Sequence, residues 1–281
     1  MVKNNYILEL KTTKSAAIKT LIENIQSLFR KVSFVFTPNK IDKNGNKLKG
    51  GLQIKEINEF NSTMVHVKLN ADDFEYFNYT YNKEYLNLGI NLAYLTKCLK
   101  CMANYDSLSM AVDADDLNHL ILSLENNKDK KTIKLQLMDL KFNFTNIKSV
   151  DFSYMIKMSS SDFNKYCKDL SIVSDRMEFI CNGKKLFLAG TGEIGDVNYE
   201  ILPSVNGLNI TTKTDKEGDI IQGIYDLKHL TVFTKCASFD PEVIIYMENN
   251  KPLILQYNVS SLGQIKIAYS EYLEPDTYDL N

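Results

Sequence analysis

Arginine is nearly absent from this chain. Of 33 basic residues, only Arg30 and Arg176 are arginine, and the others are lysine. The guanidinium fork of arginine reads base edges through paired hydrogen bonds, whereas the lysine ammonium is a flexible point charge. The composition therefore argues against sequence-specific DNA recognition and favours non-specific attraction to phosphate.

The chain also lacks a strong net charge and long apolar runs. Its formal charge is −2 and its pI is about 6.0, so any nucleic-acid binding must depend on where the lysines are placed. We find no leader with a charged start and an apolar core, and no apolar run that could span a bilayer, so we expect no membrane partner. The 281 residues, 44% of them hydrophobic, suffice for two modest domains or one large one.

Metal-ligand patterns are lacking as well. The five cysteines are an odd number, which suits a reducing compartment where cysteine acts as a small buried hydrophobe. Cys98 and Cys101 form a C-x-x-C pair, but no second pair lies at zinc-finger spacing and the chain has only three histidines. We expect both cysteines to be buried or half-buried, and we expect no metal, no cofactor and no catalytic residue.

Two short stretches imitate ligand-binding motifs. GTGEIG (190–195) fits the dinucleotide pattern and follows a strand, but the alternating stretch after it predicts a second strand instead of the required helix. We therefore expect a hairpin turn there. In TPNKIDKNGNKLKGG (37–51), Lys47 and Gln53 stand where a calcium loop needs Gly and Glu, so we expect an exposed hairpin or loop.

Four segments of the chain share one design, namely a capped helix, a short turn and an apolar strand. Their helices start near Ser15, Asn91, Ser161 and Asp226, which are about 65 to 76 residues apart by subtraction. Between the helices lie many short stretches that alternate apolar and polar residues, as strands do. The sequence predicts an α+β protein made of four similar units, in which helices cover one face of antiparallel sheets.

The second of these helices has lysines on a face of its own. Lys97 and Lys100 are three residues apart and therefore adjacent on the helix surface. The apolar residues on another face recur at helical spacing: Leu92, Leu95, Leu99 and Met102. On one helix alone, such lysines are ordinary solvated surface, so their meaning depends on the other three helices.

A candidate boundary lies in DLKFNFTNIKSVDF (139–152), which has no regular period and precedes a new strand and helix. We predict an N-terminal domain at 1–138, a connector at 139–153 and a C-terminal domain at 154–281.

Six stretches, in order, resemble a known family: LNLGINLAYLTKCLKCMANYDSLSM, KLQLMDL, KMSSSDFNKYCKDLSIVSD, LAGTGEIGDVN, HLTVFTKCASFD and KPLILQYNVSSLGQIKIAYSEYL. They are similar to proliferating cell nuclear antigen, the eukaryotic and archaeal DNA sliding clamp. The resemblance is continuous from residue 86 to 272 and holds in outline before that. The long 37–51 loop and the scarcity of arginine indicate a divergent member, viral or protist.

The resemblance implies the DNA clamp fold, with two topologically similar domains that each carry antiparallel sheets outside and two helices inside. Three chains would close head to tail into a homotrimeric ring, and the helices would line its hole. Their lysines would then face the phosphates of a duplex and hold it without reading its bases. The DNA-facing positions that it implies are Lys14, Lys19, Lys97, Lys100, Lys165, Lys168 and Lys235.

The resemblance also implies a partner-peptide pocket and a subunit interface. The pocket would involve the connector and nearby residues, namely Phe144, Ile147, Phe152, Pro252 and Tyr269, although connector side chains also serve simply to anchor a loop. The interface would pair a strand near 129–136 of one chain with a strand near 196–202 of the next. The charged residues there are Lys131, Lys134, Asp196 and Glu200, and their opposite signs favour a heterologous contact.

These implications define a non-catalytic DNA polymerase processivity factor. Its partners would be duplex DNA, DNA polymerase and other replication and repair proteins with a clamp-binding motif, and an ATP-dependent clamp loader. It would act in the nucleus, or at a cytoplasmic replication site if viral. The alternatives are a monomeric clamp-fold DNA-binding accessory or viral transcription factor, and an enzyme that uses GTGEIG as a nucleotide loop.

Overall fold

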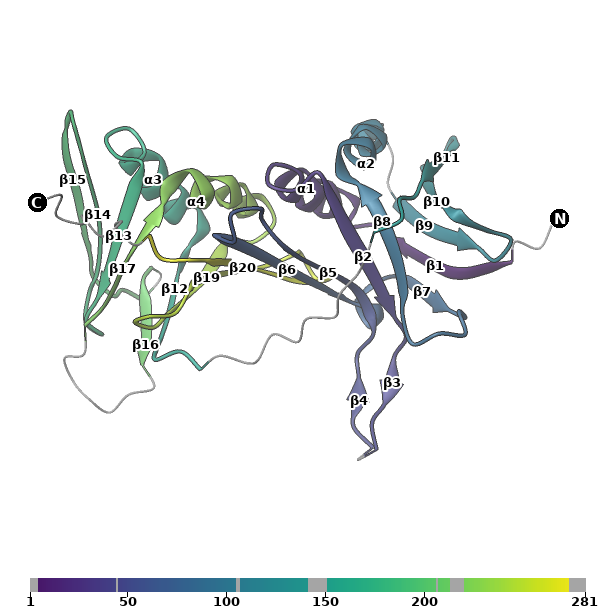
Figure 1. The fold of residues 1–281 in the computed structure, drawn as a ribbon, viewed down its shortest axis with the longest axis horizontal. Coiled ribbons are helices and arrows are strands. Elements are labelled where there is room, and N and C mark those ends of the chain that lie inside the picture. The colour runs from purple at the N-terminus through teal and green to yellow at the C-terminus, as the bar shows by residue number, and fades with distance from the viewer. Residues whose placement is uncertain are drawn as a thin grey trace, which may run out of the picture. The chain divides into compact units, whose positions relative to one another are not determined.

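The computed structural model describes residues 5–43, 45–104, 107–140, 151–205, 207–212 and 220–272. The chain forms two compact units (Figure 1). Unit 1 comprises residues 1–58, 65–147 and 257–266, and unit 2 comprises 59–64, 148–256 and 267–281. In the described part of the chain, no helix combines the length and the apolar character needed to cross a membrane.

Strands predominate in both halves of the chain, as the alternating sequence pattern predicts. The elements of the first half are β1 (Tyr6–Thr12), α1 (Ser15–Gln26), β2 (Lys31–Thr37), β3 (Lys40–Ile41), β4 (Lys47–Leu48), β5 (Gly51–Ile57), β6 (Thr63–Asn70), η1 (Ala71–Asp73), β7 (Tyr76–Tyr79), β8 (Leu86–Asn91), α2 (Leu92–Leu99), η2 (Lys100–Asn104), β9 (Ser107–Asp113), β10 (Asp116–Glu125) and β11 (Lys130–Gln136).

The second half repeats this alternation of strands and short helices. Its elements are β12 (Tyr154–Ser159), α3 (Ser160–Leu170), β13 (Arg176–Cys181), β14 (Leu186–Gly192), β15 (Gly195–Ile201), β16 (Asn209–Thr212), β17 (Ile221–Asp226), α4 (Leu227–Phe233), η3 (Thr234–Ser238), β18 (Glu242–Met247), β19 (Leu253–Asn258) and β20 (Gly263–Tyr269).

The two units share one topology. In unit 1, the strands that flank α1 pair antiparallel with those that flank α2, so that β1 lies beside β9 and β2 beside β8. In unit 2, β12 pairs with β18 and β13 with β17 around α3 and α4 in the same way. The α+β prediction is confirmed. All four segments contain a helix followed by a strand, but only α2, α3 and α4 have the predicted side-chain cap, because the residue before α1 is Lys14 and makes no such bond.

Within each unit the helices pack against each other as well as against strands. Helix α1 contacts α2, and α3 contacts α4 and η3. Their buried faces are apolar, because the predicted residues of α2 and η2 lie inside: Leu92, Leu95, Leu99 and Met102 are each at most 4% exposed. The helices are therefore amphipathic, with one face in the core and one in solvent.

Both stretches that imitate ligand-binding motifs are hairpins, as the sequence predicts. Residues 190–195 end β14 and begin β15, with Gly192 opposite Gly195 and only two residues between them. Within residues 37–51, β3 and β4 pair antiparallel as a short hairpin, which projects from the ends of β2 and β5 (Figure 1).

The prediction for the C-x-x-C pair is only half right. Cys98 is half-buried, but Cys101 is exposed. The helix tightens from α to 3-10 geometry after Leu99, so the spacing that places Leu99 inside turns Cys101 outward.

Candidate nucleic-acid interface

Side-chain caps fix the start of three helices. Asn91 Oδ1 accepts from the Tyr94 amide at 3.2 Å, and Asp226 Oδ1 accepts from the amide of Lys228 at 2.8 Å. Helix α3 is capped by Ser159, whose Oγ accepts from the Asp162 amide at 3.4 Å. These bonds satisfy amide groups that the first helical turn leaves unpaired. They therefore fix the residue at which each helix begins, and with it the residues that face solvent.

On α2 and η2, the predicted lysines lie on the solvent side. Lys97 and Lys100 are both exposed, while Leu95 and Leu99 on the same turns face the core. The Lys97 ammonium lies 6.0 Å from the centre of the Tyr94 ring, and that ring is itself 56% exposed. This face of α2 therefore offers two cations and one aromatic hydroxyl to solvent.

Helix α3 repeats the arrangement. Lys165 and Lys168 are exposed, three residues apart. The nearby acid, Asp169, is occupied because its Oδ2 accepts a hydrogen bond from the Tyr199 hydroxyl at 2.6 Å. That bond is the main reason that the pKa of Tyr199 rises to about 12. Among the described residues, neither α3 lysine has a carboxylate partner.

The remaining two helices carry their lysines farther apart along the chain. Lys14 is exposed at the start of α1, and Lys19 one turn later is half-exposed. Lys235 is exposed on η3, just beyond α4. Lys228, which the sequence analysis missed, is exposed in the first turn of α4, seven residues before Lys235. Its position two residues after the capping residue Asp226 was the available signal.

These helix lysines share one electrostatic property. Among the described residues, no carboxylate lies within ion-pair distance of Lys14, Lys19, Lys97, Lys100, Lys165, Lys168, Lys228 or Lys235. Lysines elsewhere do pair, as Lys47 does with Asp72 at 3.0 Å and Lys11 with Glu125 at 3.4 Å. The helix faces therefore carry uncompensated positive charge of the kind that attracts polyanions.

The predicted interface residues lie on two sheet edges. Strand β11 ends the five-stranded sheet β11-β10-β9-β1-β7, and β15 ends the sheet β15-β14-β13-β17. Lys131, Lys134, Asp196 and Glu200 are all exposed on these edges. Edge strands present unpaired backbone groups, which makes both edges competent to pair with another chain.

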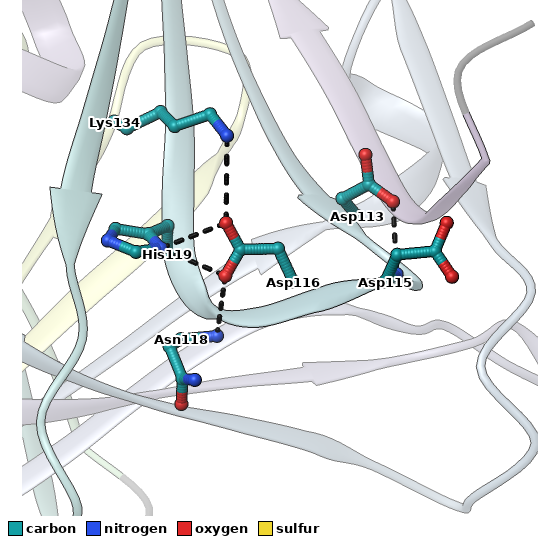
Figure 2. Close-up of polar contacts among 6 residues, drawn as sticks. All are labelled: Asp113, Asp115, Asp116, Asn118, His119 and Lys134. Atoms are coloured by element: carbon teal, nitrogen blue, oxygen red, sulfur yellow. Dashed lines mark hydrogen bonds and ion pairs between the residues drawn. The ribbon is translucent and has the colours of Figure 1, made fainter.

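Some of these interface charges already have partners within the chain. Figure 2 shows Lys134 reaching the carboxylate of Asp116, with Nζ 3.6 Å from Oδ2. His119 contacts the same carboxylate at 2.9 Å, and this hydrogen bond is the main cause of the lowered pKa of Asp116. Glu200 pairs with Lys185, and the Lys131 ammonium lies 3.2 Å from Cys101 Sγ.

The structure describes only part of the predicted peptide pocket. Phe144 and Ile147 lie outside the described residues. Phe152 is half-buried, with its ring 5.8 Å from that of Tyr246 and 5.9 Å from the Lys251 ammonium. Pro252 is exposed beside Lys251, so Phe152, Tyr246 and Pro252 mark one local surface of unit 2.

Tyr269 lies in the core instead of at the surface. It is 2% exposed, and its hydroxyl donates to the carbonyl of His229 across 3.5 Å. Burial raises its pKa well above the usual value. A docked peptide cannot touch this ring without displacing the packing around it.

Two family profiles match nearly the whole chain. The profile "Proliferating cell nuclear antigen, N-terminal domain" matches residues 7–145, and "Proliferating cell nuclear antigen, C-terminal domain" matches residues 146–272. The chain belongs to the proliferating cell nuclear antigen family. The resemblance seen in the six sequence stretches is thereby confirmed, and the two matched domains agree with the two units of equal topology.

Individual relatives in this family are distant but similar over long stretches. The chain is 28% identical over 296 residues to the "Probable DNA polymerase sliding clamp" of Acanthamoeba polyphaga mimivirus, covering 95% of this chain and 62% of that protein. It is 26% identical over 262 residues to the "Proliferating cell nuclear antigen" of Dictyostelium discoideum, covering 91% and 95%. The chain thus spans less than two thirds of the mimivirus relative.

Membership in the proliferating cell nuclear antigen family also indicates whether catalytic activity is to be expected. Sliding clamps of this family are non-catalytic scaffolds, and the expectation of a non-enzyme fits that family. The GTGEIG stretch accordingly serves as a turn. Among the described residues, no three His, Cys, Asp or Glu side chains are grouped so that they could hold a metal ion.

Proposed function

We propose that this chain is a DNA polymerase processivity factor, a sliding clamp that encircles duplex DNA and tethers replication and repair proteins to it. The observation that carries the proposal is the set of lysines without carboxylate partners on the solvent faces of all four helices. Duplex DNA is a dense line of negative charge, and lysines attract it whatever its sequence.

The kind of contact suits a protein that slides. Lysine ammonium groups hold phosphates as point charges, and they lack the rigid fork with which arginine reads base edges. Successive phosphates are equivalent to such a surface, so the complex loses little energy when the duplex moves by one step. The clamp therefore holds DNA topologically and not by tight binding.

Ring closure requires two complementary edges on each chain. We propose that β11 of one chain pairs with β15 of the next, so that three chains form a homotrimer. Lys131 and Lys134 on one edge would face Asp196 and Glu200 on the other, and like edges would repel each other. Such a heterologous contact generates a ring when its rotation closes.

Partners would join the ring in two ways. An ATP-dependent clamp loader would open it on DNA, and polymerases and other clients would dock a short apolar peptide on the connector side. The surface of Phe152, Tyr246 and Pro252, together with Phe144 and Ile147 of the connector, is the proposed docking site. The site of action would be where the genome replicates, in the nucleus or in a viral factory.

The test of encirclement compares circular with linear DNA. Clamps loaded by a cognate loader onto nicked plasmid should stay bound through gel filtration and leave after the plasmid is linearised. A monomeric DNA-binding accessory would remain on both forms, and that result would refute the ring.

Helix lysines are tested by neutralisation. Changing Lys97, Lys100, Lys165 and Lys168 to Gln should flatten the dependence of log K on log salt by about 0.9 for each phosphate that is no longer neutralised. The matched control changes four exposed lysines away from the helices, Lys43, Lys49, Lys83 and Lys184, with the same change in net charge. Equal slopes for the two variants would contradict the proposed DNA face.

A further inference from the structure

A second positive surface lies on three adjacent strands of unit 1 and involves no helix residue. Its members occupy alternate, outward positions of three strands: Lys55 of β5, His66 and Lys68 of β6, and Lys266 of β20. The residues between them, such as Ile54, Val67 and Ile265, are fully buried on the other face. We call these four residues the sheet patch.

The sheet patch generates a positive field. His66 is partly buried, and its pKa is lowered first by that burial and then by the charges of Lys55, Lys266 and Lys68. Burial also lowers the pKa of Lys55. Among the described residues, neither Lys55 nor Lys68 has a carboxylate partner. Placing the half-buried Lys55 and Lys68 near His66 without a carboxylate partner costs stability, which points to an anion that compensates these two lysines.

A polar hollow of about 380 Å³ adjoins the patch at Lys68. Its other polar walls are Asn70, Asn258, Ser260, Ser261 and Gln264, so donors surround it. The side chains of Ser260, Ser261 and Gln264 make no hydrogen bond to any described residue. One acid, Asp73, also lines the hollow, and its Oδ2 accepts a hydrogen bond from Asn70 Nδ2 at 2.6 Å.

Backbone geometry holds the hollow against the patch. The Asn70 amide donates to the carbonyl of Leu262 at 2.9 Å, which ties the end of β6 to the turn before β20. At Gly263 a Cβ atom would lie 2.1 Å from the Lys68 carbonyl oxygen, so only glycine allows this approach. Lys68 therefore belongs to both the sheet patch and the hollow, and Gln264 lines the hollow.

We propose that the sheet patch and the polar hollow together bind the phosphate backbone of a DNA strand outside the proposed ring. Lysine, serine, asparagine and glutamine are the side chains that contact phosphate oxygens in protein–DNA complexes. Arginine, which fits planar carboxylates, is absent from this surface, and its described members include no aromatic ring for stacking on bases. The contact is therefore with the backbone. The inference rests on the proposed function, which supplies the DNA.

The three histidines of the chain give separate reporters for a test. His66 lies in the sheet patch, His229 lies on α4 beside Lys228, and His119 lies on β10 beside Asp116. Imidazole ring-proton shifts of the full-length protein are followed by NMR during titration with a short oligothymidylate and, separately, with a short duplex. Oligothymidylate should move the His66 signals and leave those of His119 in place.

Variants then assign the effect to the patch. The double change Lys55→Gln with Lys68→Gln should abolish the His66 response and reduce the salt slope by about 0.7 for each phosphate that is no longer neutralised. The matched control, Lys43→Gln with Lys184→Gln, should retain both. Circular dichroism confirms that each variant is folded.

Each remaining outcome separates this inference from the proposed function. If duplex moves His229 while neither DNA moves His66, the inference is overturned and the helix contact stands. If only His66 responds, the inference stands and the helix contact fails. A polyglutamate chain of equal charge that moves His66 as strongly as oligothymidylate would identify an acidic peptide as the partner and overturn the assignment to DNA. If neither His66 nor His229 responds to either DNA, the sheet-patch inference and the helix contact are both refuted.

Discussion

Whether a side chain of this chain faces the core or solvent follows from the period of the helix or strand to which it belongs. Lys97 and Lys100 face solvent because Leu95 and Leu99 take the core side of the same turns. On β6 a period of two performs the same separation, with Val65 and Val67 inside and His66 half-exposed between them. A residue's charge environment then depends on neighbouring strands, as the lysines around His66 illustrate.

His66 predicts acid sensitivity of the fold. Its pKa is lower in the folded protein than the value of about 6.5 in an unfolded chain, so the unfolded state binds more protons between those two values. Stability should therefore fall as pH drops below about 6.5 and level off below the folded pKa. Urea unfolding at pH 7.5 and 5.5 measures the fall.

The control for that prediction removes the titrating group. His66→Gln should show a smaller loss of unfolding free energy between the same two pH values, by up to about 1.4 kcal/mol per pH unit. An identical loss in both proteins would show that other groups account for the acid sensitivity.

At the scale of elements, close backbone approaches decide where strands turn. The β14–β15 hairpin places Gly192 against the loop after α3, where a Cβ atom would lie 1.7 Å from the Val173 carbonyl oxygen. Gly195, its partner across the turn, has a φ of 145° but nothing within 4 Å of a built Cβ. Gly192 is required because a larger residue would collide with Val173, and Gly195 is required because other residues rarely adopt its positive φ.

This difference gives a paired prediction. Gly192→Ala should cost about 3 kcal/mol of unfolding free energy, because the loop must move, whereas Gly195→Ala should cost about 1 kcal/mol from backbone strain alone. Chemical denaturation of both variants tests the order. If Gly195→Ala were the more damaging change, steric contact with Val173 would not be the controlling feature.

For the whole molecule, the proposed ring depends on two charged edges. Changing Lys131 and Lys134 to Glu would place like charges opposite Asp196 and Glu200, and should weaken each contact by about 1 to 2 kcal/mol, roughly a tenfold rise in dissociation constant. Light scattering over a dilution series should give about three times the 32.2 kDa chain mass for the unaltered protein and a lower mass for the variant.

The control for the ring separates contacts between chains from those within one chain. Asp116→Asn removes the intrachain partner of Lys134 without altering either proposed edge, so it should leave the assembly intact. A mass near that of one chain for the unaltered protein at every concentration would refute the trimer and make the helix lysines an open DNA-binding face.

Much of the fold could be predicted because local periods were clear. Helix starts, the 190–195 turn and the 37–51 hairpin all depend on residues close in sequence. The errors have local causes too. Cys101 turns outward where α2 tightens, and near the end of β20 consecutive residues, Ala268 and Tyr269, are both buried, so the period of two no longer indicates which side faces solvent.

By itself, the sequence determined the element types, the fourfold repeat and the lysine faces of the helices, since each follows from spacing within a few turns or strand residues. Only the tertiary structure decided which charges keep a partner and which side chains meet. Lys55, His66 and Lys266 come together because strands far apart in the chain lie side by side in unit 1, and Tyr269 is buried because of what packs around it. Such proximity depends on how the chain folds back on itself, which no local period encodes.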